Sequence, residues 1–373
     1  MMKRALNWLP VALGVVFLLS LAYLQRERAI QGQNDFVAFY AGGRLAGTPA
    51  LYSRAENQAL IQSILGFPLE NVTYIRPPFY AALLKPLSLL PYRVAYGLFS
   101  LATLASFLWF VVRFSKECPA LPFFAAMSIP LLTALCGGQD TPLLLAILGG
   151  SMLLVRRKRD FAAGLLLSLC AIKFHLFLFV PMFLVVKKRW GILGGGVLGT
   201  ALLTALGVLV AGVDSTRAFV QTLRDPWINA SATIMPNIHG LVATLHGAAW
   251  LEVVLVCVVV GAFLWMLPRT GNYELLLAAA LVCGLLVSFH SEVFDDILLF
   301  PVFVAVFRNC ASAPLRAAAA LILTPMPYFM VLAGAPYSAM LPLSLLALLA
   351  IFCAQFIKTG AAMPAGVEAP SLG

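Results

Sequence analysis

Long apolar runs separated by short polar segments are the main pattern of this chain. The first run extends from Trp8 to Leu24, and a second extends from Tyr92 to Phe114. A helix needs about 20 apolar residues to cross the hydrocarbon core of a bilayer, so both runs predict membrane-spanning helices. The runs are continuous, whereas the strands of a membrane β-barrel alternate apolar and polar positions, so the pattern excludes a barrel.

The remaining apolar runs predict further spans at 120–136, 141–155, 191–212, 248–267, 272–289, 296–307, 315–334 and 341–357. The run 161–186 lies between two basic clusters, RRKRD and KKRW. Because basic clusters are retained on the cytoplasmic side, we predict that this run forms two short helices with Lys173 and His175 at the turn. The total is about twelve spans, with both termini in the cytoplasm.

A polar loop over 25–91 connects the first two spans, and we expect it on the outer side. Its segment NDFVAFYAGGRLAGTPALY begins at residue 34 and carries Asp35 ahead of apolar residues at helical spacing. This spacing favours an amphipathic helix in the membrane interface over 35–46, and a second such helix is predicted over 53–66. The segment 77–90 is too short to span and is predicted to be re-entrant or interfacial.

Composition agrees with a membrane protein. Hydrophobic residues make up 62% and charged residues 11% of the 373 residues, and the mean hydropathy is +0.95. Soluble domains carry about 25% charged residues. The net charge of +10 does not indicate a nucleic-acid surface, because the predicted topology places most basic residues on the cytoplasmic side. The seven cysteines lack the spacing of metal ligands and are interpreted as packing residues.

We therefore predict a single all-α, integral-membrane domain over residues 1–373. Its predicted parts are an uncleaved anchor helix (1–24), an outer catalytic loop (25–91), a helical core (92–212), a second outer loop (213–247), C-terminal helices (248–358) and a disordered cytoplasmic tail (359–373).

Polar and ionisable residues near membrane depth are the candidates for function. Such residues are costly in a bilayer, so they usually face a cavity and serve a substrate or each other. Asp295 and Asp296 are adjacent, so at most one of them lines a given cavity. The candidates expected on the outer side are Asp35, Arg44, Arg76, Lys85, Gln139, Asp140, Lys173, His175, Asn237, His239, His290, Asp295 and Asp296.

Each candidate also has a structural interpretation. Asp35 and Asp140 could be caps of the helices that follow them. Arg76 could be an anchor that reaches the lipid head groups. Lys173 lies in the middle of an apolar run and could belong to a purely structural ion pair. The histidines, taken one at a time, could equally be structural.

Six segments between residues 30 and 310 occur in an order that is shared with a known family. They are DFVAFYAGGRLAG, RPPFYAALLKPLSLLP, GGQDTPLLLAIL, AGLLLSLCAIKFHLFLFVPMFLVVKKRW, NIHGLVATLHG and SFHSEVFDDILLFPVF. In these segments the chain resembles glycosyltransferase family 87 of the GT-C superfamily of membrane glycosyltransferases. It departs from the family pattern at Ile75 and Arg76, where an aromatic residue is expected, and at Asp140, where a small or amide residue is expected.

The resemblance implies a GT-C fold and transfer of a sugar, expected to be mannose, from a polyprenyl-phosphate donor to a lipid or glycan acceptor. It implies that Asp35 is the general base. Inverting transfer requires a carboxylate that takes the proton of the acceptor hydroxyl, and the departing phosphate requires cationic or hydrogen-bonding partners. Candidates for donor binding are Arg44, Arg76, Lys173, His175, Gln139, Asn237 and His290. No metal and no other cofactor is expected.

Two other classes remain open. A transporter or flippase for a polyprenyl-linked glycan could use the same basic cavity, and the chain could be an inactive accessory subunit. Transfer is favoured because the sequence shows no repeat of the kind found in transporters, and its polar residues gather on one side. The expected location is a bacterial inner membrane, with the site on the periplasmic side. The expected partners are a polyprenyl-phosphate sugar, a lipid or glycan acceptor and membrane lipids, but no nucleic acid.

Overall fold

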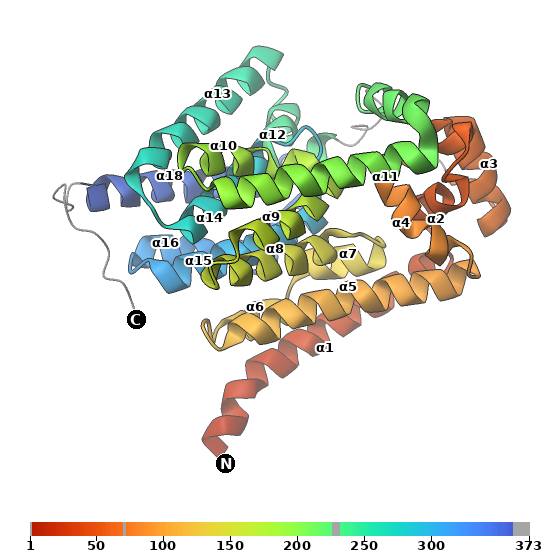
Figure 1. Ribbon diagram of the computed structural model, residues 1–373. Coiled ribbons are helices and arrows are strands. Elements are labelled where there is room, and N and C mark those ends of the chain that lie inside the picture. The colour runs from red at the N-terminus through yellow and green to blue at the C-terminus, as the bar shows by residue number, and fades with distance from the viewer. Residues whose placement is uncertain (1, 70–71, 226–231, 361–373) are drawn as a thin grey trace.

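The computed structural model describes residues 2–69, 72–225 and 232–360, and within these residues all secondary structure is helical (Figure 1). The first half contains α1 (Met2–Ile30), α2 (Phe36–Leu45), η1 (Pro49–Tyr52), α3 (Arg54–Leu65), α4 (Pro78–Ser88), α5 (Tyr92–Ser115), α6 (Leu121–Ala125), α7 (Ile129–Cys136), α8 (Thr141–Arg156), α9 (Asp160–Leu167), η2 (Ser168–Phe177) and α10 (Phe179–Val186), where η denotes a 3₁₀ helix. The second half contains α11 (Trp190–Thr222), η4 (Ala232–Ile234), α12 (Ile238–Thr244), α13 (Ala249–Met266), η5 (Leu267–Arg269), α14 (Tyr273–Val287), η6 (Val293–Leu298), α15 (Leu299–Asn309), α16 (Ala313–Ile322), α17 (Pro325–Leu332), η7 (Tyr337–Ala339) and α18 (Met340–Gly360).

The prediction of a multi-pass, all-helical membrane protein is confirmed. Six helical segments of the described chain are long and apolar enough to cross a membrane, and they are Leu9–Glu27, Tyr92–Ser115, Asp160–Phe177, Trp190–Thr222, Ala249–Arg269 and Tyr337–Ile357. Helices α16 and α17, bent by 45° at a short break, make a seventh span if they cross together. The predicted total of about twelve spans is not confirmed.

Several predicted spans differ from the observed helices because hydropathy alone does not show where a helix breaks. The run 120–136 is divided into α6 and α7, and the Ser128 side chain caps α7 by accepting a hydrogen bond from the backbone of Leu131. In contrast, α11 extends ten residues beyond the predicted span, past a kink at Gly212 (φ 79°, ψ 166°). The predicted second outer loop therefore begins as helix. The predicted tail lies almost entirely outside the described residues.

Helix α2 is buried in the protein, which differs from the interfacial helix that was predicted. Phe36 and Val37 are fully buried, and Phe39 is 3% exposed. The rings of Phe36 and Phe99 on α5 lie 4.8 Å apart, and Phe39 packs against Tyr80 on α4. A helix that is apolar on all sides is stable in a core, whereas an interfacial helix keeps a polar face. The aromatic residues therefore fix α2 against α4 and α5.

The run 161–186 folds back on itself, as the two basic clusters predicted. Asp160 at the start of α9 accepts hydrogen bonds at 2.9 Å through both carboxylate oxygens from Arg189, which follows α10. Between these ends the helix is interrupted at Lys173, whose backbone is not helical (φ −127°, ψ 54°). Figure 1 shows α11 lying along α9 and α10. Lys173 is thereby held at the turn of a helical hairpin whose two basic ends are paired.

Charged side chains gather in two layers at opposite ends of the bundle. At one end, Arg156 bonds to Glu274 at 2.6 Å and to Glu117 at 2.9 Å, and Arg308 bonds to Glu274 at 3.0 Å. Asp140 lies at the other end of α8, which has 16 residues and therefore measures about 24 Å. The layer around Asp140 contains six of the thirteen candidate functional residues.

Candidate active site

The layer around Asp140 forms a buried polar cluster where α2, α8, η2 and η6 meet the segment before α4. Six predicted candidates lie in this cluster, and they are Asp35, Arg76, Gln139, Asp140, Lys173 and Asp295. Four different helical elements and a loop therefore bring together residues that are separated by as many as 260 positions in the sequence.

Gly138 determines how the loop before α8 reaches α2. Its φ of +63° lies in the left-handed region, which favours glycine. A side chain there would also be blocked, because a Cβ atom would lie 2.6 Å from the Cβ of Phe36 and 3.0 Å from the amide oxygen of Asn34. The preceding Gly137 accepts a hydrogen bond at 3.0 Å from the backbone N–H of Asp35. This close contact places Gln139 beside the Asp35 carboxylate.

Asp35 precedes α2, but it is not a conventional helix cap. In the described structure its side chain makes no capping hydrogen bond, and the neighbouring Asn34 accepts the bond from the Phe36 N–H at 3.1 Å instead. The Asp35 carboxylate accepts a hydrogen bond from the side-chain amide of Gln139 and remains partly exposed. The capping interpretation is therefore wrong for Asp35. Its carboxylate is held by a side chain 104 residues away, at the edge of the buried cluster.

The local environment makes Asp35 a stronger base than an ordinary aspartate. Burial raises the pKa of its carboxyl group, and this effect outweighs the opposing attraction of Arg76 and Lys173 and the hydrogen bond from Gln139. A carboxylate in a less hydrated environment holds a proton more tightly, so its capacity to accept one is greater.

Arg76 links Gln139 to Asp140. Its side chain donates from Nε to an Asp140 oxygen at 3.2 Å and from Nη2 to the Gln139 carbonyl oxygen at 3.3 Å, and Arg76 is only 6% exposed. Asp140 is fully buried, and its side chain makes no capping bond within the described residues. The capping interpretation is therefore also wrong for Asp140, whose carboxylate is a counter-ion inside the protein.

Lys173 completes the cluster from the turn of the hairpin. Its ammonium group lies 2.5 Å from an Asp295 oxygen and 3.5 Å from an Asp140 oxygen, and it donates to the Thr141 hydroxyl at 2.9 Å. Thr141 in turn donates to Asp295 at 2.8 Å. Lys173 is 2% exposed, and the ion pair of its structural interpretation is present. Its role in donor binding stays a prediction.

The two adjacent acids of η6 have different environments, as their adjacency predicted. Lys173 and the hydrogen bonds to Asp295 overcome the effect of burial and lower the pKa of its carboxyl group. Asp296 is fully buried, and neither of its carboxylate oxygens has a hydrogen-bond partner in the described chain. Burial and then the charge of Asp295 raise the pKa of Asp296 well above its ordinary value.

Sequence reasoning missed two members of the site. Thr141 bridges Lys173 and Asp295, and Glu292 begins η6 with a reciprocal capping box that also involves Asp295. Burial, followed by the charges of Asp35 and Asp295, raises the pKa of Glu292 to about 7. The spacing of Glu292 and Asp295 in the segment SEVFDD is the sequence signal for the capping box, because the two residues are three positions apart.

A narrow cleft adjoins the cluster, and its lining includes Arg76, His175 and His290. The rings of His175 and His290 lie 6.5 Å apart. His175 is 6% exposed, and its Nε2 atom has no hydrogen-bond partner among the described residues. Burial lowers the pKa of His290 to about 4, so its imidazole is neutral near pH 7. The cleft therefore presents a guanidinium group and two imidazoles to any group that enters it.

Four further predicted candidates lie away from both the cluster and the cleft. Arg44 is exposed at the opposite end of α2 from Asp35, and Lys85 donates to the backbone carbonyl of Ala46 at 3.0 Å. Asn237 is fully buried and bonds to the backbone of Gly240 and Ser288, so it fixes the loop before His290. His239 pairs with Glu252 at 3.0 Å. Roles of Arg44 and Asn237 in donor binding stay predictions.

The described residues contain no group of three or more His, Cys, Asp or Glu side chains that is arranged to hold a metal ion. The buried carboxylates of Asp140 and Asp295 are instead paired with Arg76 and Lys173. The expectation that the site needs no metal stays a prediction.

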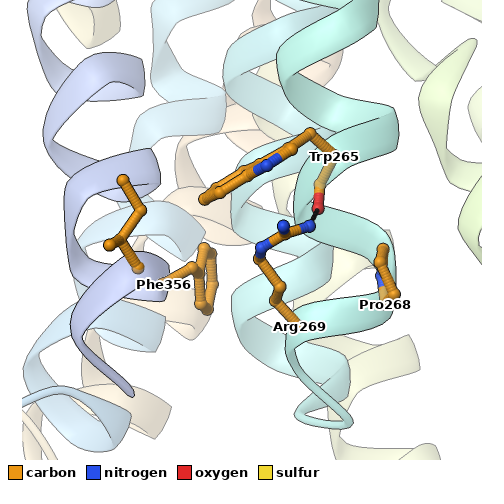
Figure 2. A pocket seen from close by; sticks show the side chains of 5 residues that line it. Trp265, Pro268, Arg269 and Phe356 are labelled. Carbon is orange, nitrogen blue, oxygen red and sulfur yellow. Dashed lines mark hydrogen bonds between the residues drawn. The ribbon is translucent and has the colours of Figure 1, made fainter. Parts of the chain in front are cut away.

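A separate pocket of about 470 Å³ lies between the end of α13 and α18, at the Glu274 end of the bundle. Figure 2 shows Arg269 beneath Trp265, with Phe356 beside them. The Arg269 guanidinium lies 3.7 Å from the centre of the Trp265 ring. An arginine on an aromatic face at a helix end is a common structural contact. The described residues that line the pocket include no carboxylate, so the polar cluster is the candidate active site.

Comparison with known families connects this site to an activity. A sequence model of glycosyltransferase family 87 matches residues 74–291, which is more than half of the chain. The matched region contains Arg76, Gln139, Lys173 and His175, and it begins after Asp35. Searches of curated proteins and of solved structures found no match. The chain belongs to glycosyltransferase family 87 and is a membrane glycosyltransferase that acts on a sugar donor and an acceptor.

Proposed function

We propose that this glycosyltransferase moves a sugar, most simply mannose, from a polyprenyl phosphate to a hydroxyl group of a lipid or glycan acceptor. Asp35 acts as general base, and the reaction inverts the configuration at the anomeric carbon. The site faces the outer side of the membrane, which in a bacterium is the periplasmic side of the inner membrane. The products are a glycosylated acceptor of the cell envelope and a free polyprenyl phosphate.

The environment of Asp35 is the observation that carries this proposal. Its carboxylate is not used as a cap in the described structure, is only partly exposed and is oriented by Gln139. Of the three carboxylates that the cluster places around Arg76 and Lys173, Asp140 and Asp295 are fully buried in ion pairs. Asp35 is the one of these three whose carboxylate is partly exposed, so an acceptor hydroxyl can reach it.

The reaction proceeds as a single displacement. The acceptor oxygen attacks the anomeric carbon from the face opposite the phosphate, and its proton passes to Asp35. The bond between the anomeric carbon and the phosphate oxygen breaks, and the electron pair leaves with the lipid phosphate. Hydrogen bonding by Gln139 keeps one Asp35 oxygen occupied, so the other oxygen takes the proton.

Negative charge develops on the departing phosphate and needs stabilisation by fixed donors. Arg76 joins the cluster to the cleft that His175 and His290 line, so a phosphate in that cleft would meet a guanidinium group and two imidazoles. Gln139 and Arg76 are bonded to each other, and this contact sets the positions of the base and the phosphate partner together.

The sidedness rests on the distribution of charge. The hairpin base carries the basic clusters RRKRD and KKRW, and the candidate site lies at its turn. Basic loops remain in the cytoplasm, so the turn, and with it the active site, faces the other side.

Transfer by purified protein in liposomes tests the proposal. The liposomes contain membrane lipids from a strain that lacks this protein, and the donor is polyprenyl phosphate carrying radiolabelled mannose. We expect Asp35→Asn to fold, to bind the donor and to transfer label about 100-fold more slowly, because an amide cannot take the proton. Asp214→Asn, which changes an exposed aspartate on α11, is the matched control.

Two results would contradict the proposal. If Asp35→Asn transfers label at the wild-type rate, Asp35 is not the base. If the wild-type protein moves the labelled donor between leaflets but attaches no label to lipid or glycan, the protein is a flippase and not a transferase of this kind.

A further inference from the structure

An apolar groove runs beside the hairpin and has a volume of about 450 Å³. It lies between the α9–η2–α10 hairpin and the first half of α11, which are neighbours in Figure 1. Its lining is almost entirely apolar and includes Leu167, Phe177, Leu178, Pro181, Leu193 and Val197. Close approach of α11 to α9 forms the floor, since a Cβ at Gly164 would lie 1.9 Å from the carbonyl oxygen of Ile192.

One end of this groove reaches the polar cleft of the active site. Phe174 lines both the groove and the cleft, and the cleft is also lined by Arg76, His175 and His290. The buried Nε2 atom of His175 is without a hydrogen-bond partner in the described chain. An apolar channel that ends at a cation and an unpaired imidazole matches a long hydrocarbon chain that ends in a phosphate.

We propose that this groove binds the isoprenoid chain of the donor, with the first isoprene units between the hairpin and α11 and the phosphate in the cleft. This inference rests on the proposed function and specifies how the donor lies. The chain would enter sideways from the bilayer, because the groove is open toward the outer surface of the helices. Thr200, Leu178 and Val197 of its lining are all exposed.

A second apolar groove is the alternative location for the chain. It has a volume of about 390 Å³, lies among α1, α7 and α17, and touches Gly137, whose carbonyl bonds to the backbone of Asp35. Its polar lining consists of Gln25, Gln33 and Thr133, and the described lining contains no Lys, Arg or His. A phosphate at its end would lack a cation, so charge complementarity favours the groove along α11.

The cleft must widen before a phosphate can enter. Its volume is about 10 Å³, which is room for about one water molecule. Phe174 and Phe289 line it, and 36% and 37% of their surfaces are exposed, so a rotation of these rings would widen the cleft. The chain of the donor would hold Phe174 in the open position because Phe174 also lines the groove.

Two glycines on α11 allow a matched test. Gly196 lines the groove, and a Cβ there would lie 3.8 Å from its nearest neighbour, Gly164. Gly194 is on the same helix outside the groove lining, and a Cβ there would lie 3.9 Å from a Phe161 ring carbon. A Cβ atom at either position would lie at ordinary van der Waals distance from its neighbour, so Gly196→Phe fills the groove and Gly194→Phe controls for helix and surface effects. Thr200→Phe is a second groove-filling variant.

The probe is a polyprenyl phosphate with a diazirine in its second isoprene unit. We expect cross-links within residues 164–200 that excess unlabelled polyprenyl phosphate removes and phosphatidylglycerol does not. Affinity for polyprenyl phosphate should fall about tenfold in Gly196→Phe and in Thr200→Phe, because about two methylene groups lose their contacts. Gly194→Phe should bind like the wild type.

The outcomes separate this inference from the proposed function. Cross-links on α1, α7 and α17, or cross-links that unlabelled polyprenyl phosphate does not remove, would overturn the groove assignment even if mannose is transferred. Equal affinity of the Gly196→Phe, Thr200→Phe and Gly194→Phe proteins would overturn it as well. Competed cross-links along α11 without any sugar transfer would support the groove and reject the proposed reaction.

Discussion

Replacing Lys173 with Met is expected to destabilise the protein before it affects catalysis. The ammonium group lies 2.5 Å from Asp295 and 3.5 Å from Asp140, and all three residues are at most 2% exposed. At an effective dielectric constant of about 20, these contacts correspond to attractions of about 7 and about 5 kcal/mol. Desolvation offsets much of this attraction, and breaking one side of a buried ion pair typically costs about 3–5 kcal/mol.

We therefore expect Lys173→Met to lower the free energy of unfolding by about 3–5 kcal/mol. The Met side chain fills similar space, so the loss arises from Asp295, which stays buried without its cation. Adding Asp295→Asn removes that charge and should restore part of the lost stability. The coupling between the two sites should be of the order of 2 kcal/mol. Unfolding in mixed micelles, followed by tryptophan fluorescence, measures all four proteins of this cycle.

The pH dependence supplies a second check. Lys173 and its hydrogen bonds lower the pKa of Asp295 despite burial, so the stability from this pair is present above the unfolded pKa and is lost as the pH falls through the folded pKa. The difference in free energy of unfolding between the wild type and Lys173→Met should accordingly become smaller at acidic pH. A Lys173→Met protein within about 1 kcal/mol of the wild type, or a double variant no more stable than the single one, would refute the reasoning.

Three further changes test the rest of the site. Gly138→Ala should destabilise the protein by about 1 kcal/mol or more and lower transfer, since it places a Cβ against Phe36 in a left-handed turn; thermal unfolding and transfer assays measure both. Gln139→Glu should shift the acidic limb of the pH profile of kcat/KM to higher pH, because a second carboxylate raises the pKa of Asp35. An unchanged limb would show that the profile does not report the ionisation of Asp35. In the wild type, burial raises the pKa of Glu292 to about 7, so stability falls as the pH rises toward 7; Glu292→Gln should remove this fall in pH-dependent unfolding.

The sequence predicted the parts of the fold that charge and hydropathy determine directly. The positive clusters around 161–186 predicted a hairpin, and Asp160 and Arg189 indeed close its base. The adjacency of Asp295 and Asp296 predicted different environments, and only Asp295 joins the cluster. These predictions succeeded because each depends on a short stretch of sequence, either on adjacent residues or on the charge that flanks an apolar run.

The interactions between distant residues could not be predicted in the same way. The sequence identified Lys173 as a costly charge, but its counter-ion Asp295 is 122 residues away. The pattern of α2 predicts aromatic residues that face lipid. In the structure Phe36 packs against α5, and the loop after α7 contacts Phe36 at Gly138. Apolar side chains suit lipid and protein equally well, so their pattern does not distinguish an interfacial helix from a buried one. The burial of Phe36 and Phe39 and the close approach at Gly138 show that α2 is a buried helix.

The balance of charge in the cluster links donor binding to protons. Arg76 and Lys173 already have counter-ions in Asp140 and Asp295, and Asp35 adds a further acid. A lipid phosphate would bring still more negative charge into a region with little water, where excess charge is strongly unfavourable. Glu292, with a pKa of about 7, is the acid best placed to compensate by taking up a proton. The enzyme would then hold its donor more tightly on the acidic side of neutrality.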